Sequence, residues 1–158
     1  MLQDSVDQLI TKLREKNFTL ATAESCTGGL LSALIIKKAG ASAIFDRGFI
    51  TYSNASKTEM LGVPASIIKT HGAVSEQTAK AMAEGTINNS HANLSIAITG
   101  IAGPEGGSAD KPVGLVYFGY ALKGGSSGSI KSNFTGSRQN IQTAAAKFAI
   151  QNLIEILD

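Results

Sequence analysis

The alternation of strand-like and helix-like segments constrains this fold more than any other feature of the sequence. Apolar residues at helical spacing, together with capping residues, predict helices at 5–16, 30–38, 54–61 and 64–70, after Ser75, and from Ser137 onward. Apolar runs bounded by turn residues predict strands at 18–23, 49–52, 94–98, 114–122 and 129–134. Because strands and helices alternate early and a hairpin comes late, we expect a single-domain α/β/α sandwich with a mixed sheet, spanning residues 1–158.

Composition excludes several classes of protein. Apolar residues make up 43% and charged residues 16% of the 158 positions, which argues against disorder. The net charge of +2 is too balanced for a protein that coats nucleic acid. The longest apolar run, Leu30 to Ile36, is too short for a membrane span, and the polar start of the chain is unlike a signal peptide. We therefore expect a cytoplasmic protein with neither nucleic acid nor membrane as a partner.

A polar, glycine-containing turn between the first strand and the second helix is the first candidate site. The turn ends in two adjacent glycines, Gly28 and Gly29, and before them come Glu24, Ser25, Cys26 and Thr27. The first backbone N–H groups of a helix lack internal partners and favour negative charge, so such a turn can hold a phosphate or an oxyanion. The alternative is a plain N-cap by Ser25 or Thr27.

The segment 51–57 is the second candidate, because it offers a phenol (Tyr52), an amide (Asn54) and an amine (Lys57). A lysine held near a serine hydroxyl can act as a general base once burial has lowered its pKa far enough to leave it neutral. The alternative is an exposed lysine on a short helix. Ser66 and Lys69 match the short SxxK pattern of some serine acylases, but the SDN and KTG motifs of those enzymes are absent from the sequence.

Two further features point to ligand binding. The glycine-rich loop 100–112 follows a strand that looks buried, which is where ligands bind in α/β sheets. Arg138 opens the last helix and is a candidate fork for a phosphate. The alternatives are a mobile surface loop and an ordinary surface arginine.

Cys26 is a rival nucleophile, since a helix start lowers a thiol pKa and His71 could pair with it. A lone cysteine is more often a small buried hydrophobic residue. His71 and His91 lie twenty positions apart with no metal-binding spacing, so we expect no metal site.

Six blocks follow one another in order along the sequence: Thr22–Gly29, Thr51–Asn54, His71–Glu76, Thr99–Pro104, Lys111–Gly114 and Phe134–Arg138. Together they resemble one family, the CinA C-terminal domain family of nicotinamide-nucleotide amidohydrolases. The resemblance extends from about residue 5 to residue 155.

The resemblance implies hydrolysis of nicotinamide mononucleotide to nicotinic acid mononucleotide and ammonia, in pyridine nucleotide recycling. It implies a serine nucleophile, Ser25, with Lys57 and Tyr52 as catalytic partners, no metal or organic cofactor, and a homodimer or higher homo-oligomer. Backbone N–H groups of 26–28 or of 100–103 would stabilise the oxyanion. The substrate-binding candidates are Glu24, Thr27, Gly28, Asn54, Gly100, Ile101, Ala102, Gly103 and Arg138. The alternative function is a non-catalytic nucleotide-binding or competence-associated partner-binding module.

Overall fold

The sheet is mixed, and it lies between two layers of helices. The computed structural model describes residues 2–158, and over these residues the sheet has five strands in the order β2-β1-β3-β4-β5. Strand β1 is parallel to β2 and β3, whereas β4 is antiparallel to β3 and β5. The strands are β1 (Leu20–Glu24), β2 (Phe45–Ile50), β3 (Leu94–Gly100), β4 (Leu115–Leu122) and β5 (Ser127–Asn133). The predicted α/β/α sandwich with a mixed sheet is confirmed.

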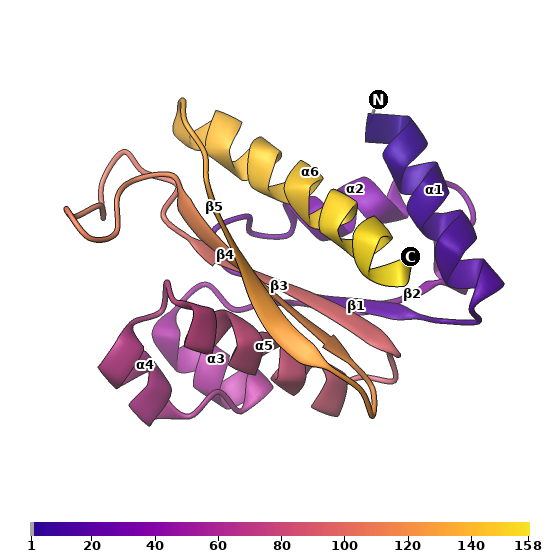
Figure 1. Ribbon diagram of the computed structural model, residues 1–158, viewed down its shortest axis with the longest axis horizontal. Helices are drawn as coiled ribbons and strands as arrows, with labels where there is room; N and C mark the ends of the chain where they lie inside the picture. The colour runs from indigo at the N-terminus through magenta and orange to yellow at the C-terminus, as the bar shows by residue number, and fades with distance from the viewer. Residues whose placement is uncertain (1) are drawn as a thin grey trace.

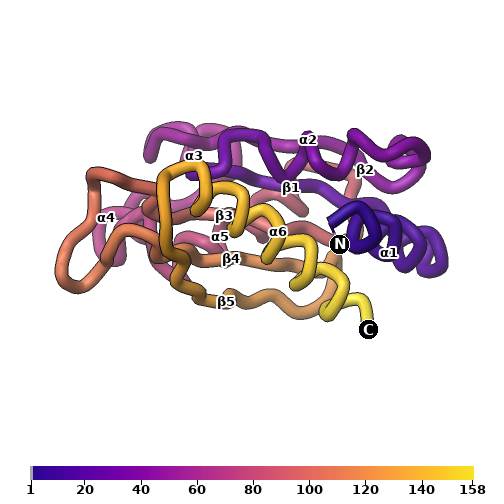
Figure 2. Tube along the Cα trace, turned by 90° about the horizontal axis from the view of Figure 1, so that it is seen from above, coloured from indigo at the N-terminus to yellow at the C-terminus, as the bar shows by residue number. Residues whose placement is uncertain are grey.

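Helices cover both faces of the sheet (Figure 1). The helices are α1 (Leu2–Glu15), α2 (Leu30–Ile36), α3 (Asn54–Leu61), α4 (Ala65–His71), α5 (Glu76–Asn88) and α6 (Arg138–Leu157), with a short 3-10 helix η1 (Ala41–Ala43). Helices α1, α2 and α6 lie on one face, where α6 contacts both of the others, and the view from above in Figure 2 shows the three together. Helices α3, α4 and α5 lie on the other face.

Serine caps place three of the helices as the sequence predicts. Ser53, Ser75 and Ser137 each accept a hydrogen bond from the backbone N–H three residues later, at distances of 3.1 Å. A side-chain oxygen at this position satisfies one of the amides that the helix leaves without a partner. These caps therefore fix where α3, α5 and α6 begin, and the candidate residues Asn54 and Lys57 lie on α3 and Arg138 on α6.

Helix α5 packs directly on strand β4, and glycine makes this approach possible. A Cβ atom at Gly119 would lie 1.9 Å from the carbonyl oxygen of Ala79. On the opposite face a larger apolar core forms beneath α1, α2 and α6. Phe118 belongs to this core, and the partly buried Phe134 and Phe148 pack against it with their rings in contact. Both layers are thus anchored to the central strands, whose ends carry the site.

Strand β2 differs from the prediction of a strand at 49–52. It begins at Phe45 and ends at Ile50, so Thr51 and Tyr52 follow the strand. It is an edge strand whose residues are partly or fully exposed, so it lacks the apolar run that marks the central strands. The shift matters for the site, because it leaves the carbonyl groups of Thr51 and Tyr52 outside the strand.

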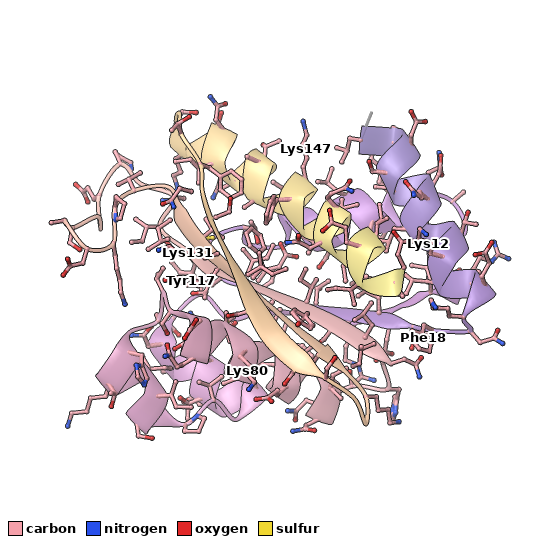
Figure 3. The ribbon with its side chains drawn as sticks, viewed as in Figure 1. Lys12, Phe18, Lys80, Tyr117, Lys131 and Lys147 are labelled. Atoms are coloured by element: carbon pink, nitrogen blue, oxygen red, sulfur yellow. The ribbon has the colours of Figure 1, made fainter. Side chains whose placement is uncertain are left out.

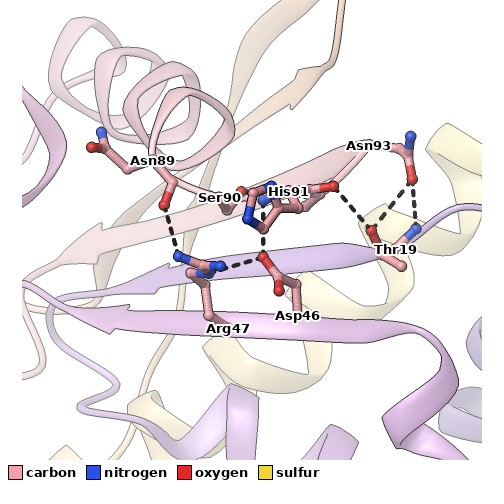
Figure 4. Close-up of polar contacts among 8 residues, drawn as sticks. Thr19, Asp46, Arg47, Asn89, Ser90, His91 and Asn93 are labelled. Atoms are coloured by element: carbon pink, nitrogen blue, oxygen red, sulfur yellow. Dashed lines mark hydrogen bonds and ion pairs between the residues drawn. The ribbon is translucent and has the colours of Figure 1, made fainter.

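A polar network, shown in Figure 4, joins the amino ends of the parallel strands. The candidate residues lie at the carboxyl ends of the same strands. Asp46 accepts a hydrogen bond of 3.0 Å from the backbone N–H of His91, and this bond, with Arg47 beside it, lowers the pKa of Asp46. Asn93 accepts one of 2.8 Å from the N–H of Thr19. His91 thus takes part in joining strand ends.

Candidate active site

A cavity of about 290 Å³ opens where the carboxyl ends of β1, β2 and β3 converge. From β1 the chain passes to β2 through α2 on one face, and then to β3 through α3, α4 and α5 on the other. Ligands bind at such a switch point in open α/β sheets. The cavity is lined by Ser25, Cys26, Tyr52, Asn54, Lys57, Ala73, Val74, Thr99, Gly100, Ile101, Ala102, Gly103, Glu105, Gly106 and Arg138.

Ser25 and Lys57 meet in this cavity. Ser25 directly follows β1, and Lys57 projects inward from the first turn of α3. The two side chains are joined by a hydrogen bond of 3.0 Å between Lys57 Nζ and Ser25 Oγ. Lys57 is only 1% exposed, whereas Lys80, Lys131 and Lys147 are exposed at the surface (Figure 3). The alternative of an exposed lysine on a short helix is therefore wrong.

The surroundings of Lys57 favour its neutral form. Burial lowers the pKa of its amine from 10.5 to about 8, against a smaller opposing effect of Cys26. Nζ lies 2.8 Å from the carbonyl oxygen of Thr51 and 3.3 Å from that of Tyr52. A neutral amine has two N–H groups and one lone pair. If the two carbonyl groups accept the N–H groups, the lone pair remains for the hydroxyl proton of Ser25.

The side-chain carboxylate of Glu24 occupies the start of α2. Glu24 is 1% exposed and accepts hydrogen bonds from the N–H groups of Gly29, Leu31 and Ser32, at 3.2, 2.9 and 2.9 Å. The hydroxyl of Thr27 donates to the same carboxylate at 2.7 Å. The position that caps α2 is Gly29, with no side-chain cap. This helix start is thus neither capped by Ser25 or Thr27 nor open to a ligand.

Three of the residues that we predicted to bind substrate do not reach the cavity wall. Glu24 and Thr27 turn toward the start of α2, and Gly28 lies on the outer side of the same turn. The structure does bring together Asn54, the segment 100–103 and Arg138 with the three catalytic candidates. These residues come from β3 and from loops and helix starts that are distant in sequence.

Tyr52 and Arg138 form the outer wall of the cavity. Tyr52 is 64% exposed, and its phenol accepts a hydrogen bond of 3.4 Å from Nη2 of Arg138. Nη1 of Arg138 donates to the carbonyl oxygen of Gly103 at 2.8 Å. Tyr52 thus contacts Lys57 through its main-chain carbonyl, and its phenol points to the arginine. Arg138 links the loop after β2 to the loop after β3.

Three main-chain amides in the cavity wall lack a main-chain carbonyl as a hydrogen-bond partner in the part of the chain that the structure describes. The N–H groups of Ser25 and Ile101 are taken by the carbonyl oxygens of Ile98 and Leu115, both at 2.9 Å. Within residues 2–158, the amides of Cys26, Ala102 and Gly103 donate to no main-chain carbonyl. All three of these residues line the cavity.

The sequence did not single out Ala73, Val74, Thr99, Glu105 or Gly106 as site residues. The link between two of their segments is a hydrogen bond of 2.8 Å from the hydroxyl of Thr99 to the carbonyl oxygen of Ala73. Ala73, Val74 and Thr99 lie within two of the six family-like blocks, which is the signal that could have found them. Glu105 and Gly106 lie in the glycine-rich loop 100–112, which the sequence indicated only as a whole.

The rival pair of Cys26 and His71 does not assemble. Burial raises the pKa of the Cys26 thiol to about 12, so it stays protonated at neutral pH. His71 is exposed at the end of α4 and does not line the cavity. Its carbonyl oxygen accepts a hydrogen bond of 2.6 Å from Nζ of Lys111. Of the two candidate nucleophiles, Ser25 is the one whose side chain is hydrogen-bonded to Lys57.

Residues 2–158 contain neither a cluster of metal-ligating side chains nor a membrane-spanning helix. No three side chains among His, Cys, Asp and Glu gather there in a way that could hold a metal ion. No helix in the same part of the chain is long and apolar enough to cross a membrane.

Comparisons with known proteins give a consistent result. A sequence model described as the CinA C-terminal domain matches residues 2–157. The nicotinamide-nucleotide amidohydrolase PncC of Enterobacter agglomerans is 48% identical over 142 residues, which cover 90% of this chain and 87% of that protein. A putative competence-damage inducible protein of Caldicellulosiruptor bescii is 47% identical over 153 residues, which cover 97% of this chain and 36% of that protein. The crystal structure of the competence/damage inducible protein CihA from Agrobacterium tumefaciens matches with a TM-score of 0.96 at 41% identity, covering 99% of this chain and 96% of that one.

Proposed function

The chain belongs to the CinA C-terminal domain family, and from this premise we propose that it hydrolyses the carboxamide of a nicotinamide nucleotide. The substrate is nicotinamide mononucleotide, and the products are nicotinic acid mononucleotide and ammonia, in pyridine nucleotide recycling. One observation carries the proposal most directly: a buried amine lies 3.0 Å from a serine hydroxyl in the wall of a cavity. The name of the relative from Enterobacter agglomerans supports the choice of substrate.

The first step is nucleophilic attack by Ser25. The neutral amine of Lys57 takes the hydroxyl proton, and Oγ bonds to the carboxamide carbon of the substrate. The carbonyl oxygens of Thr51 and Tyr52 hold the ammonium group that forms. Tyr52 thus orients the base through its main-chain carbonyl group.

The amides of Cys26, Ala102 and Gly103 are the donors for the oxyanion of the tetrahedral intermediate. Losing one such donor typically costs about 10²–10³-fold in rate. The Lys57 ammonium then gives its proton to the leaving nitrogen, which departs as ammonia. Water, deprotonated by the same amine, hydrolyses the acyl-enzyme and frees Ser25.

The phosphate of the substrate binds at the outer wall of the cavity in this proposal. The carboxylate of Glu24 already fills the start of α2, so that helix offers no place for an anion. Arg138 stands at the first position of α6, a 20-residue helix, and a guanidinium group binds phosphate through a fork of donors. Asn54 at the start of α3 completes this wall.

Release of ammonia from nicotinamide mononucleotide by the purified protein tests the proposal. Ser25→Ala and Lys57→Met should each lower kcat by at least about 10³-fold, because one removes the nucleophile and the other its base. Ser66→Ala and Lys69→Met are matched controls on α4, outside the cavity, and should leave kcat unchanged. Absence of ammonia release by the unaltered protein would rule out the proposed activity.

The alternative is a binding module without catalysis, and the name of the relative from Caldicellulosiruptor bescii keeps it open. Such a module would bind the nucleotide with no turnover, and Ser25→Ala would change nothing. Calorimetric titration of the unaltered protein with the nucleotide, beside the ammonia assay, separates the two functions.

We further infer a homodimer or higher homo-oligomer and a cytoplasmic location. Exposed apolar side chains support association, among them Ile36 and Ile50, which are 56% and 55% exposed. The mass of the particle in light scattering coupled to gel filtration tests this inference, and a monomeric mass at micromolar concentration would contradict it.

A further inference from the structure

We propose that Glu24 is a positioning residue for the reaction, which holds the turn carrying Ser25 so that its hydroxyl stays within reach of Lys57. This inference rests on the proposed function and concerns the same site. It also changes the interpretation of Glu24, which the sequence suggested as a substrate-binding residue. The carboxylate lies behind the nucleophile and not in the cavity wall.

The side chain of Glu24 accepts hydrogen bonds from residues along the turn from 25 to 32. One carboxylate oxygen, Oε1, accepts from the hydroxyl of Thr27 and the N–H groups of Gly29 and Leu31. The other, Oε2, accepts from the N–H and the hydroxyl of Ser32, at 2.9 and 2.6 Å. Gly28 and Gly29 have φ angles of +58° and +106°, and this left-handed curl turns the amides toward the carboxylate. The turn is therefore wrapped around a single buried group.

The main chain at Glu24 joins both partners of the catalytic pair. Its carbonyl oxygen accepts a hydrogen bond of 2.9 Å from the N–H of Thr51, whose own carbonyl oxygen holds Lys57. The next residue, Ser25, donates its N–H to Ile98 of β3. Movement at residue 24 is thus transmitted to the serine on one side and to the lysine on the other.

All the hydrogen-bond partners of Glu24 are donors, so both ends of its side chain must act as acceptors. Glutamine has nearly the same shape, but its NH₂ group is a donor. In either orientation, the NH₂ group of Glu24→Gln would face at least one main-chain N–H, from Ser32 on one side or from Gly29 and Leu31 on the other. Two facing donors repel each other, so the turn must move. A displacement of about 1 Å at the nucleophile can cost about 10²-fold in rate.

The effect should fall on the chemical step and not on substrate binding. Glu24 does not line the cavity, so it makes no contact with the substrate in the proposed complex. The predicted result for Glu24→Gln is a kcat reduced by about 10- to 100-fold with KM within about threefold of its normal value. Loss of stability alone would leave both constants of the folded enzyme unchanged.

The experiment measures kcat, KM and Tm for Glu24→Gln, Ser32→Ala and Thr27→Val. The latter two remove single hydroxyl donors and should lower kcat by smaller factors, so they keep the test valid if Glu24→Gln does not fold. Ser95→Ala is the matched control: its buried hydroxyl donates 2.7 Å to the carbonyl oxygen of Ala83, at the opposite end of β3. It should lower Tm and leave kcat unchanged.

A second measurement separates this inference from the proposed function. The rate at which a fluorophosphonate labels Ser25, followed by intact mass, reports the reactivity of the serine without any amide substrate. Slow labelling of Glu24→Gln, with normal labelling of Ser95→Ala, supports the inference whether or not nicotinamide mononucleotide is the substrate. Normal labelling and normal kcat in folded Glu24→Gln would overturn it, whereas an unaltered protein that labels but releases no ammonia contradicts the proposed function alone.

Discussion

Lys57 stands in a place where its charged form is disfavoured, and this single residue links stability to activity. With 1% of its surface exposed and its pKa lowered from 10.5 to about 8, its amine sheds a proton on folding in mildly alkaline solution. Catalysis as proposed needs the neutral amine. The burial that prepares the base therefore reduces the stability of the fold.

The pH profile of the reaction is the first consequence. Below pH 8 the amine of Lys57 is mostly protonated, so kcat/KM should rise about tenfold per pH unit there and level off above pH 8. Ammonia release between pH 6 and pH 9.5 measures the profile. Lys80→Met, which alters an exposed lysine on α5, should leave it unchanged, and a flat profile for the unaltered protein would contradict a neutral-amine base.

The stability of the fold should change in a pH range set by the same group. Between pH 8 and pH 10.5 the unfolded chain binds more protons than the native one, so the free energy of unfolding rises with pH there. Below pH 8 the buried amine of Lys57 is charged in the native state, and this lowers the free energy of unfolding by about 3 kcal/mol. Lys57→Met removes the titrating group and should therefore unfold with a higher free energy than the unaltered protein below pH 8. This difference in the free energy of unfolding should shrink as the pH rises from 8 to 10.5. Urea unfolding of both proteins measures this, and a constant difference across that range would contradict it.

Cys26 should be inert, although it sits beside the nucleophile in the sequence. Its thiol is 6% exposed, and burial raises its pKa to about 12. Iodoacetamide at pH 7.5 should leave the activity intact, since a protonated thiol is a poor nucleophile, and Cys26→Ser should keep most of kcat. Rapid inactivation, absent in Cys26→Ser, would revive the thiol mechanism.

At the scale of elements, the sequence predicted helices better than the edge strand. Serine caps and the apolar spacing placed α3, α5 and α6, because these signals act locally. The sequence misplaced β2 because this edge strand has no fully buried residue and therefore shows little apolar pattern. The role of the Glu24 carboxylate was also not predictable: the adjacent glycines at 28–29 indicate a turn, but they do not specify that its amides face this side chain.

The packing of α5 on β4 leads to a prediction at this scale. Gly119→Ala places a Cβ 1.9 Å from the carbonyl oxygen of Ala79, so α5 must move, at a cost of about 3 kcal/mol or more. Gly124→Ala is a useful contrast: its φ is +69° but its Cβ meets no atom within 4 Å, so only about 1 kcal/mol of backbone strain arises. Thermal unfolding of both variants measures the difference, and a larger loss for Gly124→Ala would contradict the packing account.

For the whole molecule, the sequence predicted the site as separate pieces. Ser25, Lys57 and the loop after Thr99 stood out as segments, and the resemblance to a family grouped them. Their convergence follows from the strand order, which places the ends of β1, β2 and β3 side by side. A single sequence does not specify strand order, so the distance between Ser25 and Lys57 could only come from the structure.

The carboxylate inside the start of α2 has a consequence for inhibition. The carboxylate of Glu24 already accepts the amides at the start of α2, so an anion in the proposed complex binds at the Arg138 end of the cavity instead. Phosphate or sulfate would then compete with a phosphorylated substrate and leave the serine chemistry itself untouched. An inhibitor that mimics the tetrahedral centre escapes this competition, provided that it carries no phosphate of its own.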